Sequence, residues 1–313
     1  MADKTYVHLT GGLGNQLFQY AAGLYLNSES QIFLEDKTGV PRGSNKADIF
    51  GFELSSASAM PTDYKSNFLL RKSFAYTLRT HANPKHQMFF VVFRKVTVIL
   101  TSLICTLNFR KIIKVVPNLG VGFDSKFKKR RGNSFIVGYF QTYKWSNSRN
   151  VRDKLAQLKL YKSNTFVDEC RQTSKERNPL IVHVRLGDYL NEDSFGIPNV
   201  DYYRLAIDFH LSKNLYDEIW VFSDEISKAR DYLPDEIAVP VVFKDDAKSS
   251  PAQILEAMRY GKGYVLANST FSWWAATLSY SKKCQVVAPD PWFKAGESPI
   301  ELHPPHWKLI NAY

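Results

Sequence analysis

The residues of this sequence best suited to chemistry follow an apolar stretch that ends at a glycine. The segment from Leu180 to Tyr189, LIVHVRLGDY, predicts a strand buried on both faces, with His183 and Arg185 at its end. Open α/β sheets bind ligands at the carboxyl ends of their strands. An arginine presents a planar fork of N–H donors that fits phosphate oxygens and stays charged at any working pH. We therefore interpret Arg185 as a phosphate clamp. The alternative is an ion pair with a structural carboxylate such as Asp188.

A glycine-rich turn near the start, GGLGNQ, is a second candidate. It places Gly12, Gly14, Asn15 and Gln16 between a predicted strand and a predicted helix. Glycines let backbone N–H groups approach a phosphate at a helix N-terminus, although a tight turn without a ligand uses the same residues. The spacing is not G-x-G-x-x-G. Asp36, roughly 20 residues further on, keeps a nicotinamide-dinucleotide site open as an alternative.

A third cluster of polar residues lies late in the chain, in the segment NSTFSWW. Asn268, Ser269, Thr270 and Ser272 follow a predicted strand and precede a predicted helix. Their amide and hydroxyl groups can donate to an anion at that helix N-terminus. We expect them to add to the phosphate site.

The elements that position these clusters follow from hydrophobic periodicity. Apolar runs of four to six residues alternate with helical patterns, and this alternation predicts parallel sheets. The predicted strands are Thr5–Thr10, Gln31–Glu35, Phe135–Phe140, Leu180–Val184, Glu218–Phe222, Val239–Phe243, Tyr264–Ala267 and Cys284–Val287. The predicted helices are Gln16–Asn27, Val151–Val167, Val200–Leu211, Glu225–Leu233, Pro251–Tyr260 and Phe271–Ser281. We place a domain boundary near residue 150, which gives an N-terminal domain of residues 1–150 and a C-terminal domain of residues 151–313.

Three motifs in this order carry a resemblance to a known family. GGLGNQLFQYA, HVRLGDY and NSTFSWW resemble the motifs of the α-1,2-fucosyltransferases of glycosyltransferase family 11, from about Val7 to about Ala276. The resemblance implies an α/β fold of the GT-B type, in which two Rossmann-like domains face a cleft. The donor would bind the C-terminal domain, and the N-terminal domain would lie on the acceptor side. The sequence departs from the family motif HxRRGDY at Leu186, which replaces the second arginine.

The resemblance also implies a reaction and a set of binding residues. An inverting transferase of this kind moves L-fucose from GDP-β-L-fucose to the 2-hydroxyl of a terminal β-galactose. His183 would contact the nucleotide, and either Asp224 or Glu225 would accept paired donors from guanine while the other caps the next helix.

The diphosphate charge of such a donor must be neutralised. The sequence contains no D-x-D pair to hold a divalent metal ion. We therefore expect no metal cofactor, with the charge carried by Arg185, by backbone amides near Gly14 and Asn15, and by the hydroxyls of the NSTFSWW segment. The carboxylates that follow the clamp are the candidates for the catalytic base, and they are Asp188, Glu192 and Asp193. The choice among them stays open, with Asp188 favoured as a partner of Arg185.

Charge and cysteine content bear on partners and location. Residues 1–150 hold 21 Lys and Arg against 8 Asp and Glu, whereas residues 151–313 hold 20 against 22. Three dispersed cysteines indicate a reducing compartment, and the N-terminus lacks a signal-peptide pattern. We expect a cytoplasmic enzyme that acts in O-antigen or surface polysaccharide synthesis, peripheral on the cytoplasmic face of the inner membrane. Its acceptor would be a galactose-terminated glycan, including a lipid-linked one.

The basic surplus is densest from Lys65 to Arg131, where 15 cations accompany the single acid Asp124. Within it lies an apolar stretch, Met88 to Leu107, that Arg94 and Lys95 interrupt. Neither half reaches the roughly 20 residues needed to span a bilayer. We expect amphipathic packing of this stretch into the first domain's core. Contact with an anionic membrane surface is a hypothesis that its basic surroundings suggest.

Two other classes of protein remain as alternatives. An NAD(P)-dependent oxidoreductase would explain the βαβ start and Asp36, but it gives no role to Arg185 or to the NSTFSWW segment. A nucleic-acid-binding protein would explain the basic first half. We expect no nucleic-acid partner, because the basic surplus does not coincide with the motifs at the strand ends.

Overall fold

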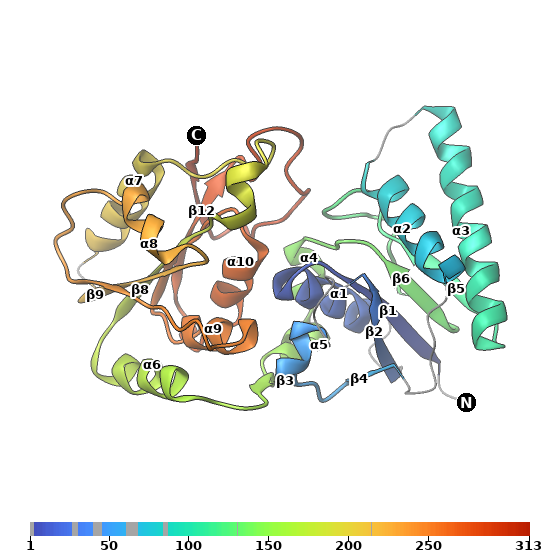
Figure 1. The fold of residues 1–313 in the computed structure, drawn as a ribbon, viewed down its shortest axis with the longest axis horizontal. Helices are drawn as coiled ribbons and strands as arrows, with labels where there is room; N and C mark the ends of the chain where they lie inside the picture. Colours follow the sequence, from blue (N-terminus) through green and yellow to red (C-terminus); the bar gives the residue numbers. More distant parts are fainter. Residues whose placement is uncertain are drawn as a thin grey trace. The chain divides into compact units, whose positions relative to one another are not determined.

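The structure is a computed structural model that describes residues 3–26, 31–39, 46–60, 68–83, 87–129, 131–213 and 215–313. The chain divides into two compact units, each built on a parallel sheet (Figure 1). Unit 1 comprises Met1–Lys159 and Pro299–Leu302, and unit 2 comprises Leu160–Ser298 and His303–Tyr313. The α/β class with a parallel sheet in each half is confirmed.

The sheet of unit 1 has five strands in the order β4-β2-β1-β6-β5, all paired in parallel. Its strands are β1 (Lys4–Thr10), β2 (Gln31–Gly39), β4 (Ala57–Ala59), β5 (Lys114–Pro117) and β6 (Ser134–Val137). The other elements are α1 (Leu13–Leu26), η1 (Asp48–Gly51), β3 (Phe52–Glu53), α2 (Phe68–Ala82), α3 (Met88–Phe109), α4 (Tyr143–Ser146) and α5 (Arg149–Leu155). The predicted end of the first helix, Asn27, lies outside the described residues.

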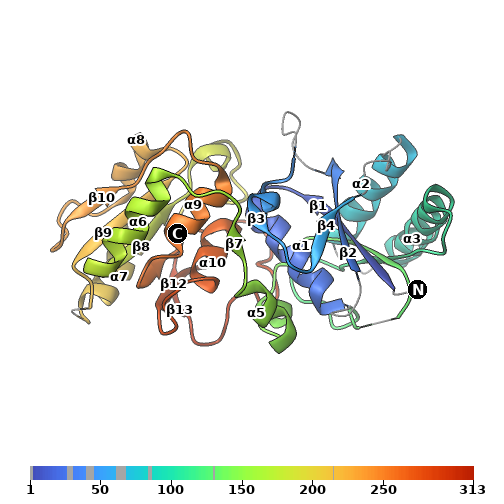
Figure 2. The same ribbon diagram turned by 90° about the horizontal axis from the view of Figure 1, so that it is seen from below.

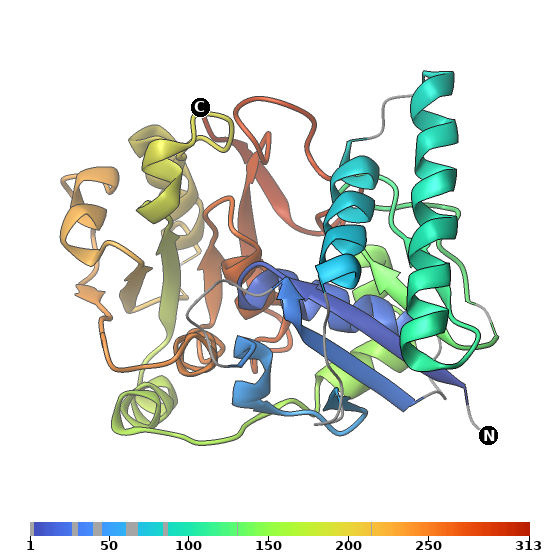
Figure 3. The same ribbon diagram turned by 45° about the vertical axis from the view of Figure 1, so that its right-hand side comes forward.

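The two faces of this sheet carry alternate side chains of the same strands. Val7, Ile32 and Ile136 face α1, where Gly23 lets the helix approach the sheet closely. On the other face Tyr6, Phe33 and Phe135 form a core with residues of α2, α3 and β5. Figure 3 shows α2 and α3 side by side over that face.

The sheet of unit 2 has six strands in the order β10-β9-β8-β11-β12-β13, again all parallel (Figure 2). They are β8 (Pro179–Val184), β9 (Glu218–Ser223), β10 (Val241–Phe243), β11 (Gly263–Val265), β12 (Gln285–Asp290) and β13 (Lys308–Asn311). Numbered along unit 2, this order is 3-2-1-4-5-6, the doubly wound order of dinucleotide-binding folds.

Helices cover both faces of that sheet. The helices of unit 2 are α6 (Thr165–Glu176), η2 (Gly187–Asn191), α7 (Val200–Leu211), α8 (Ile226–Ala229), η3 (Arg230–Tyr232), α9 (Pro251–Met258) and α10 (Thr270–Thr277). α7 packs on the face that carries Leu180, Val182 and Val184. β7 (Lys159–Leu160) lies where the chain passes from unit 1 to unit 2. It divides the helix predicted for residues 151–167, because Asn164 caps a new helix, α6, by accepting from the amide of Val167.

The helix α3 corrects the prediction for the apolar stretch. It is one continuous helix of 22 residues despite Arg94 and Lys95. Its buried positions include Arg94, Thr97 and Thr101, whereas Phe89, Ile99 and other apolar side chains are exposed. The helix is amphipathic, but its polar stripe faces the protein. The expectation that the stretch packs into the core holds for Val98, Ile104 and Cys105 but is wrong for most of its apolar residues.

Candidate active site

The carboxyl edge of the unit 2 sheet has a point where the connections diverge. The chain leaves β8 toward β9 on one side, whereas β11 lies on the other side of β8. In doubly wound sheets a crevice opens at such a switch point, and ligands bind there. The loop after β8 begins with Arg185, and the loop after β11 contains Asn268. The order of the strands thus brings two of the three sequence motifs together.

Arg185 is held between two carboxylates. Its Nη2 lies 2.6 Å from Oδ1 of Asp188, and its Nη1 lies 3.0 Å from Oδ2 of Asp224. Its guanidinium also lies over the ring of Tyr189, 5.5 Å from the ring centroid. The side chain is 32% exposed, so the guanidinium is fixed by protein groups and still reaches solvent. The ion pair with Asp188 is the contact that the sequence raised as the alternative to a phosphate clamp, and the exposure leaves room for both roles.

The residues after Arg185 turn the chain away from the strand. The amide of Leu186 donates to Oδ1 of Asp224 at 2.9 Å, and the Leu186 side chain is fully buried in the core under α7. A Cβ atom at Gly187 would collide with Oδ2 of Asp224. Position 186 therefore supplies a core residue where the family motif has its second arginine. The absence of a side chain at Gly187 lets Asp224 approach the loop.

His183 is buried beside this cluster and lies 6.2 Å, between ring centroids, from Phe271. Burial, reinforced by the positive charge of Arg185, lowers the pKa of His183 to about 3. The imidazole is therefore neutral at physiological pH. Among the described residues, its Nδ1 has no hydrogen-bond partner.

Most polar side chains of the loop after β11 form hydrogen bonds within the protein. The Asn268 amide donates to the carbonyls of Phe195 and Gly196, at 2.9 and 3.0 Å, and thereby ties the two loops of the switch point together. Ser269 is the N-cap of α10 and accepts from the amide of Phe271. Ser272 is fully buried and donates to carbonyls of its own loop, because a polar group inside a helix must find a local acceptor.

Of the three hydroxyl groups that the sequence predicts as donors to a ligand, two remain candidates. Thr270 is partly exposed at the first position of α10, and Ser269 is buried beside it as the N-cap. Ser272 is not available to a ligand in this structure, and we withdraw it from the predicted set. Asn268 holds the loops instead of presenting its amide to solvent.

The two acids after β9 differ in their surroundings. Asp224 is 25% exposed and engages both Arg185 and the amide of Leu186. Glu225 is 41% exposed and lies 3.8 Å from Lys228. Glu225 occupies the N-cap of α8 but makes no capping hydrogen bond through its side chain. Asp224 therefore positions the arginine, and Glu225 is the acid more available to a nucleobase.

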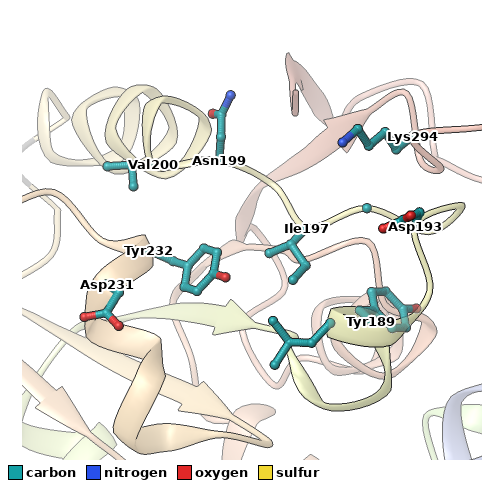
Figure 4. Close-up of a pocket in the computed structure, with 10 residues that line it drawn as sticks. Tyr189, Asp193, Ile197, Asn199, Val200, Asp231, Tyr232 and Lys294 are labelled. Carbon is teal, nitrogen blue, oxygen red and sulfur yellow. The ribbon is translucent and has the colours of Figure 1, made fainter.

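The remaining acids after the clamp lie in an exposed loop. Glu192 accepts a hydrogen bond from Ser194 at 2.9 Å, and Asp193 lines a pocket of about 410 Å³. Figure 4 shows Asp193 and Lys294 on one side of this pocket, with Tyr232 on the other. Arg185 does not line the pocket, so the pocket lies beside this residue and not at it.

The glycine-rich turn belongs to unit 1, at the carboxyl end of β1. Gly12 is exposed, and a Cβ atom there would meet no atom within 4 Å. Gly14 is buried in the first turn of α1, and the Asn15 side chain accepts from Gln141 at 2.9 Å. Gln16 is fully buried, donates to the Gly11 carbonyl and accepts from the amide of Ile49. Gln16 therefore holds the turn, and we withdraw it as a ligand contact.

Sequence reasoning missed two features of these sites. Tyr189 supplies the ring beneath Arg185, and its hydroxyl donates to the Asn268 carbonyl at 3.1 Å. Its place in the motif was the available signal. In unit 1, Nδ1 of His8 lies 3.1 Å from Oε2 of Glu35, both buried, because the parallel register sets these residues side by side on β1 and β2.

Among the described residues, no three His, Cys, Asp or Glu side chains form a group that could hold a metal ion.

Comparison with known proteins gives the family of the chain. The O-antigen biosynthesis glycosyltransferase WbnK of Escherichia coli is 26% identical over 317 residues, which cover 96% of this chain and 99% of that protein. An α-1,2-colitosyltransferase of Escherichia coli is 26% identical over 324 residues, 97% of each. The crystal structure of the fucosyltransferase NodZ from Bradyrhizobium aligns with a TM-score of 0.47 and 10% identity, over 89% of this chain and 94% of that one.

Residues 125–305, more than half of the chain, match the profile of Glycosyl transferase family 11. This match covers β8 with Arg185, the Asp224 turn and the NSTFSWW segment. It favours a glycosyltransferase over both an NAD(P)-dependent oxidoreductase and a nucleic-acid-binding protein. The chain belongs to glycosyltransferase family 11.

Proposed function

We propose that this glycosyltransferase moves L-fucose from GDP-β-L-fucose to the 2-hydroxyl of a terminal β-galactose, with inversion at the transferred carbon and without a metal ion. The observation that carries the proposal is the guanidinium of Arg185, fixed by Asp188 and Asp224 at the switch point of the unit 2 sheet and 32% exposed. A charged fork at this position suits the leaving diphosphate of a nucleotide sugar.

The charge that develops on the diphosphate would be met by groups that are already oriented. The guanidinium carries five N–H groups, and the two ion pairs engage one terminal nitrogen each, which leaves donors for phosphate oxygens. The N-terminus of α10, with Ser269 and Thr270, adds a helix dipole end and hydroxyl groups. Preorganised donors of this kind stabilise a leaving group without having to reorganise.

The roles of the acids follow from their engagements. We assign guanine recognition to Glu225, because Asp224 is occupied by Arg185 and Leu186. We take the base that removes the acceptor proton from the exposed pair Glu192 and Asp193, since Asp188 is bound to Arg185. A base in an exposed loop need not be in its final position before the acceptor binds.

The biological setting is proposed from the relatives. One is named for O-antigen biosynthesis and the other for α-1,2 transfer of colitose. We propose that this chain likewise extends a bacterial surface glycan through an α-1,2 linkage, on the cytoplasmic side of the inner membrane. The colitosyltransferase makes the identity of the transferred sugar the first point to test.

The test is GDP release from GDP-fucose and from GDP-colitose, in excess EDTA, across galactose-ended and other disaccharides. The variant Arg185→Ala runs beside the wild type. Turnover of GDP-fucose on galactosides in EDTA, with a loss of about a hundredfold or more in the variant, supports the proposal. If only GDP-colitose reacts, the proposed donor sugar is wrong, but the proposed role of Arg185 stands. Activity that disappears in EDTA and returns with added magnesium rejects the metal-free clamp.

A further inference from the structure

The helical pair α2–α3 of unit 1 presents an apolar surface to its surroundings. On α3 the exposed side chains are apolar at positions that recur every three or four residues, and these are Met88, Phe89, Val92, Phe93, Val96, Ile99, Leu100, Leu103 and Leu107. At 3.6 residues per turn they fall within an arc of roughly 140°. Ile99 and Leu107 are 66% and 70% exposed. An exposed apolar stripe of this length is unusual on a protein surface that faces water, and it indicates an interaction site.

The opposite stripe of α3 explains why the helix is oriented this way. Arg94, Thr97, Thr101 and Cys105 face the protein. The hydroxyl of Thr101 donates to the Thr97 carbonyl and accepts from the hydroxyl of Thr77 on α2 at 3.0 Å. Turning the apolar stripe inward would expose these partnered polar groups and break their contacts. The contacts between α2 and α3, which form a helical hairpin, therefore keep the polar stripe of α3 inward and its apolar stripe outward.

This burial pattern also decides how the helix can meet a bilayer. Among the described residues α3 is the one helix long and apolar enough to cross a membrane by length and composition, with a mean hydropathy of 2.0. Its polar stripe is packed against α2 and β5, so lipid cannot surround it. A helix with one apolar face and one protein-bound face lies along an interface instead of spanning it.

The charges around the stripe select the partner. Exposed cations accompany it on both helices and directly after α3, namely Arg71, Lys72, Arg79, Lys95, Arg110, Lys111 and Lys114. The one acid between residues 65 and 131 is Asp124, whose carboxylate accepts from the backbone amides of Leu119 and Lys126. Lys65, Lys85 and Arg130 of this basic segment lie outside the described residues.

A second copy of the chain fits this surface poorly. A symmetric self-contact pairs the same surface with itself, so it would bring these cations opposite one another with almost no acid to compensate. An anionic phospholipid surface suits both parts of this region. Its acyl chains can bury the apolar stripe, and its negative headgroups can pair with the cations. On α2 the exposed Phe68, Leu69 and Tyr76 lie among Arg71, Lys72 and Arg79, which extends the same mixture.

We propose that the α2–α3 hairpin is a membrane-docking element, in which the apolar stripe of α3 enters the headgroup boundary of an anionic bilayer and the surrounding cations bind its headgroups. This inference rests on the hairpin alone and does not depend on the sugar, the acceptor or the chemistry of Arg185.

The test is flotation of the full chain with vesicles of phosphatidylcholine alone or mixed with phosphatidylglycerol, at low and high salt. The stripe variant carries Ile99→Gln and Leu103→Gln, and its control is Leu205→Gln, at a position 47% exposed on α7. The charge variant carries Arg110→Gln and Lys111→Gln, and its control replaces the exposed neighbours Lys282 and Lys283 with Gln. Circular dichroism and thermal melting show that each variant is folded.

We expect binding to the mixed vesicles at low salt. The stripe variant and the charge variant should each partition about tenfold more weakly or worse, whereas the two controls should bind like the wild type. A tryptophan at position 103, introduced by Leu103→Trp, should be quenched by brominated acyl chains, and one introduced by Leu205→Trp should not.

Three results would overturn the proposal. The first is a wild type that ignores phosphatidylglycerol vesicles at low salt. The second is a loss of binding in the control variants equal to that in the stripe variant. The third is a wild-type dimer in sedimentation that the stripe variant converts to a monomer, without vesicle binding, which would assign the surface to a second copy.

Discussion

Oδ2 of Asp224 lies 3.0 Å from Nη1 of Arg185, while Oδ1 of the same carboxylate accepts from the amide of Leu186 at 2.9 Å. One acid at the end of β9 thus fixes both the guanidinium at the end of β8 and the start of the loop that follows it. The pairing crosses between adjacent strands, so the sheet itself sets the position of the cation.

Replacing this acid should loosen Arg185 without unfolding unit 2. Asp224→Asn keeps an oxygen for the Leu186 amide but removes the negative charge beside the guanidinium. We expect kcat/KM for the nucleotide sugar to fall about tenfold to a hundredfold, because a misplaced donor stabilises the leaving group poorly. Steady-state kinetics and calorimetric GDP binding measure the effect.

Asp188→Asn provides the comparison for that experiment. Its carboxylate also pairs with Arg185 but is 65% exposed, and exposed ion pairs contribute little. Its loss should therefore be smaller. Equal effects for the two variants would show that burial of Asp224 is not what positions the arginine.

Gly187→Ala tests the same relationship from the other side. The new Cβ atom would collide with Oδ2 of Asp224, so the carboxylate must rotate away from Arg185 or the loop must shift. We expect a loss of activity similar to that of Asp224→Asn, with a melting temperature lowered by a few degrees. In the double variant the two losses should not add, because both break one contact. Additive losses would separate the two residues.

Gly12→Ala separates a ligand contact from a turn requirement. A Cβ atom at Gly12 meets no protein atom within 4 Å, so the variant should fold as the wild type does. At Gly11 the φ of +71° and the adjacent Asn15 side chain make the same change costly, by about 1 kcal/mol or more. If the turn binds phosphate through its backbone, Gly12→Ala should raise the KM for the donor while stability is unchanged. An unaltered KM would leave the turn with a structural role alone.

Unit 2 should lose stability in mild acid. Burial lowers the pKa of His183 to about 3 and of His210 to about 4, whereas the unfolded value is 6.5. Nε2 of His210 donates to the Tyr264 carbonyl at 3.1 Å, and its Nδ1 lies 3.2 Å from the Tyr216 hydroxyl, a neutral arrangement. Below pH 6.5 the unfolded chain takes up protons that the folded unit refuses, so the stability present above that pH falls as the pH approaches 4.

The expected loss is about 1 kcal/mol per histidine between pH 7.5 and pH 5.5. Urea unfolding followed by tryptophan fluorescence measures it in the transition of unit 2. His210→Gln should flatten this dependence whatever its effect on stability at pH 7.5. A free energy of unfolding that is the same at both pH values in the wild type would contradict the neutral, buried state of these rings.

Local pattern in the sequence was enough to predict the framework of unit 2. The helix Val200–Leu211 has the predicted bounds, and the strand predicted for Leu180–Val184 begins one residue earlier, at Pro179. The short edge strand β13 and the return of Pro299–Leu302 to unit 1 depend on contacts between distant residues, which no local pattern contains.

The sequence was enough to locate the motifs of the site, but not to predict what each of their side chains contacts. Sequence placed Arg185 correctly at the end of a strand, but it could not tell polar groups that face a ligand from those that satisfy the backbone. Gln16 and Ser272 belong to the second kind. The prediction of which face of α3 is buried failed for another reason. It assumed that water covers every exposed face.

Leu186 allows a last test of how this chain differs from its family. Its side chain is fully buried in the core under α7, beside Val184 and Tyr203. Restoring the arginine of the family motif, as Leu186→Arg, would bury a guanidinium without a partner or force the loop outward. We expect the free energy of unfolding to fall by about 3 kcal/mol or more, with no gain in activity. Leu186→Met, which conserves volume, should cost less than about 1.5 kcal/mol. Urea unfolding and GDP-release kinetics on both variants decide the matter. If Leu186→Arg were as stable as the wild type and more active, the side chain at this position could turn toward the donor, and the core role of Leu186 would be incidental.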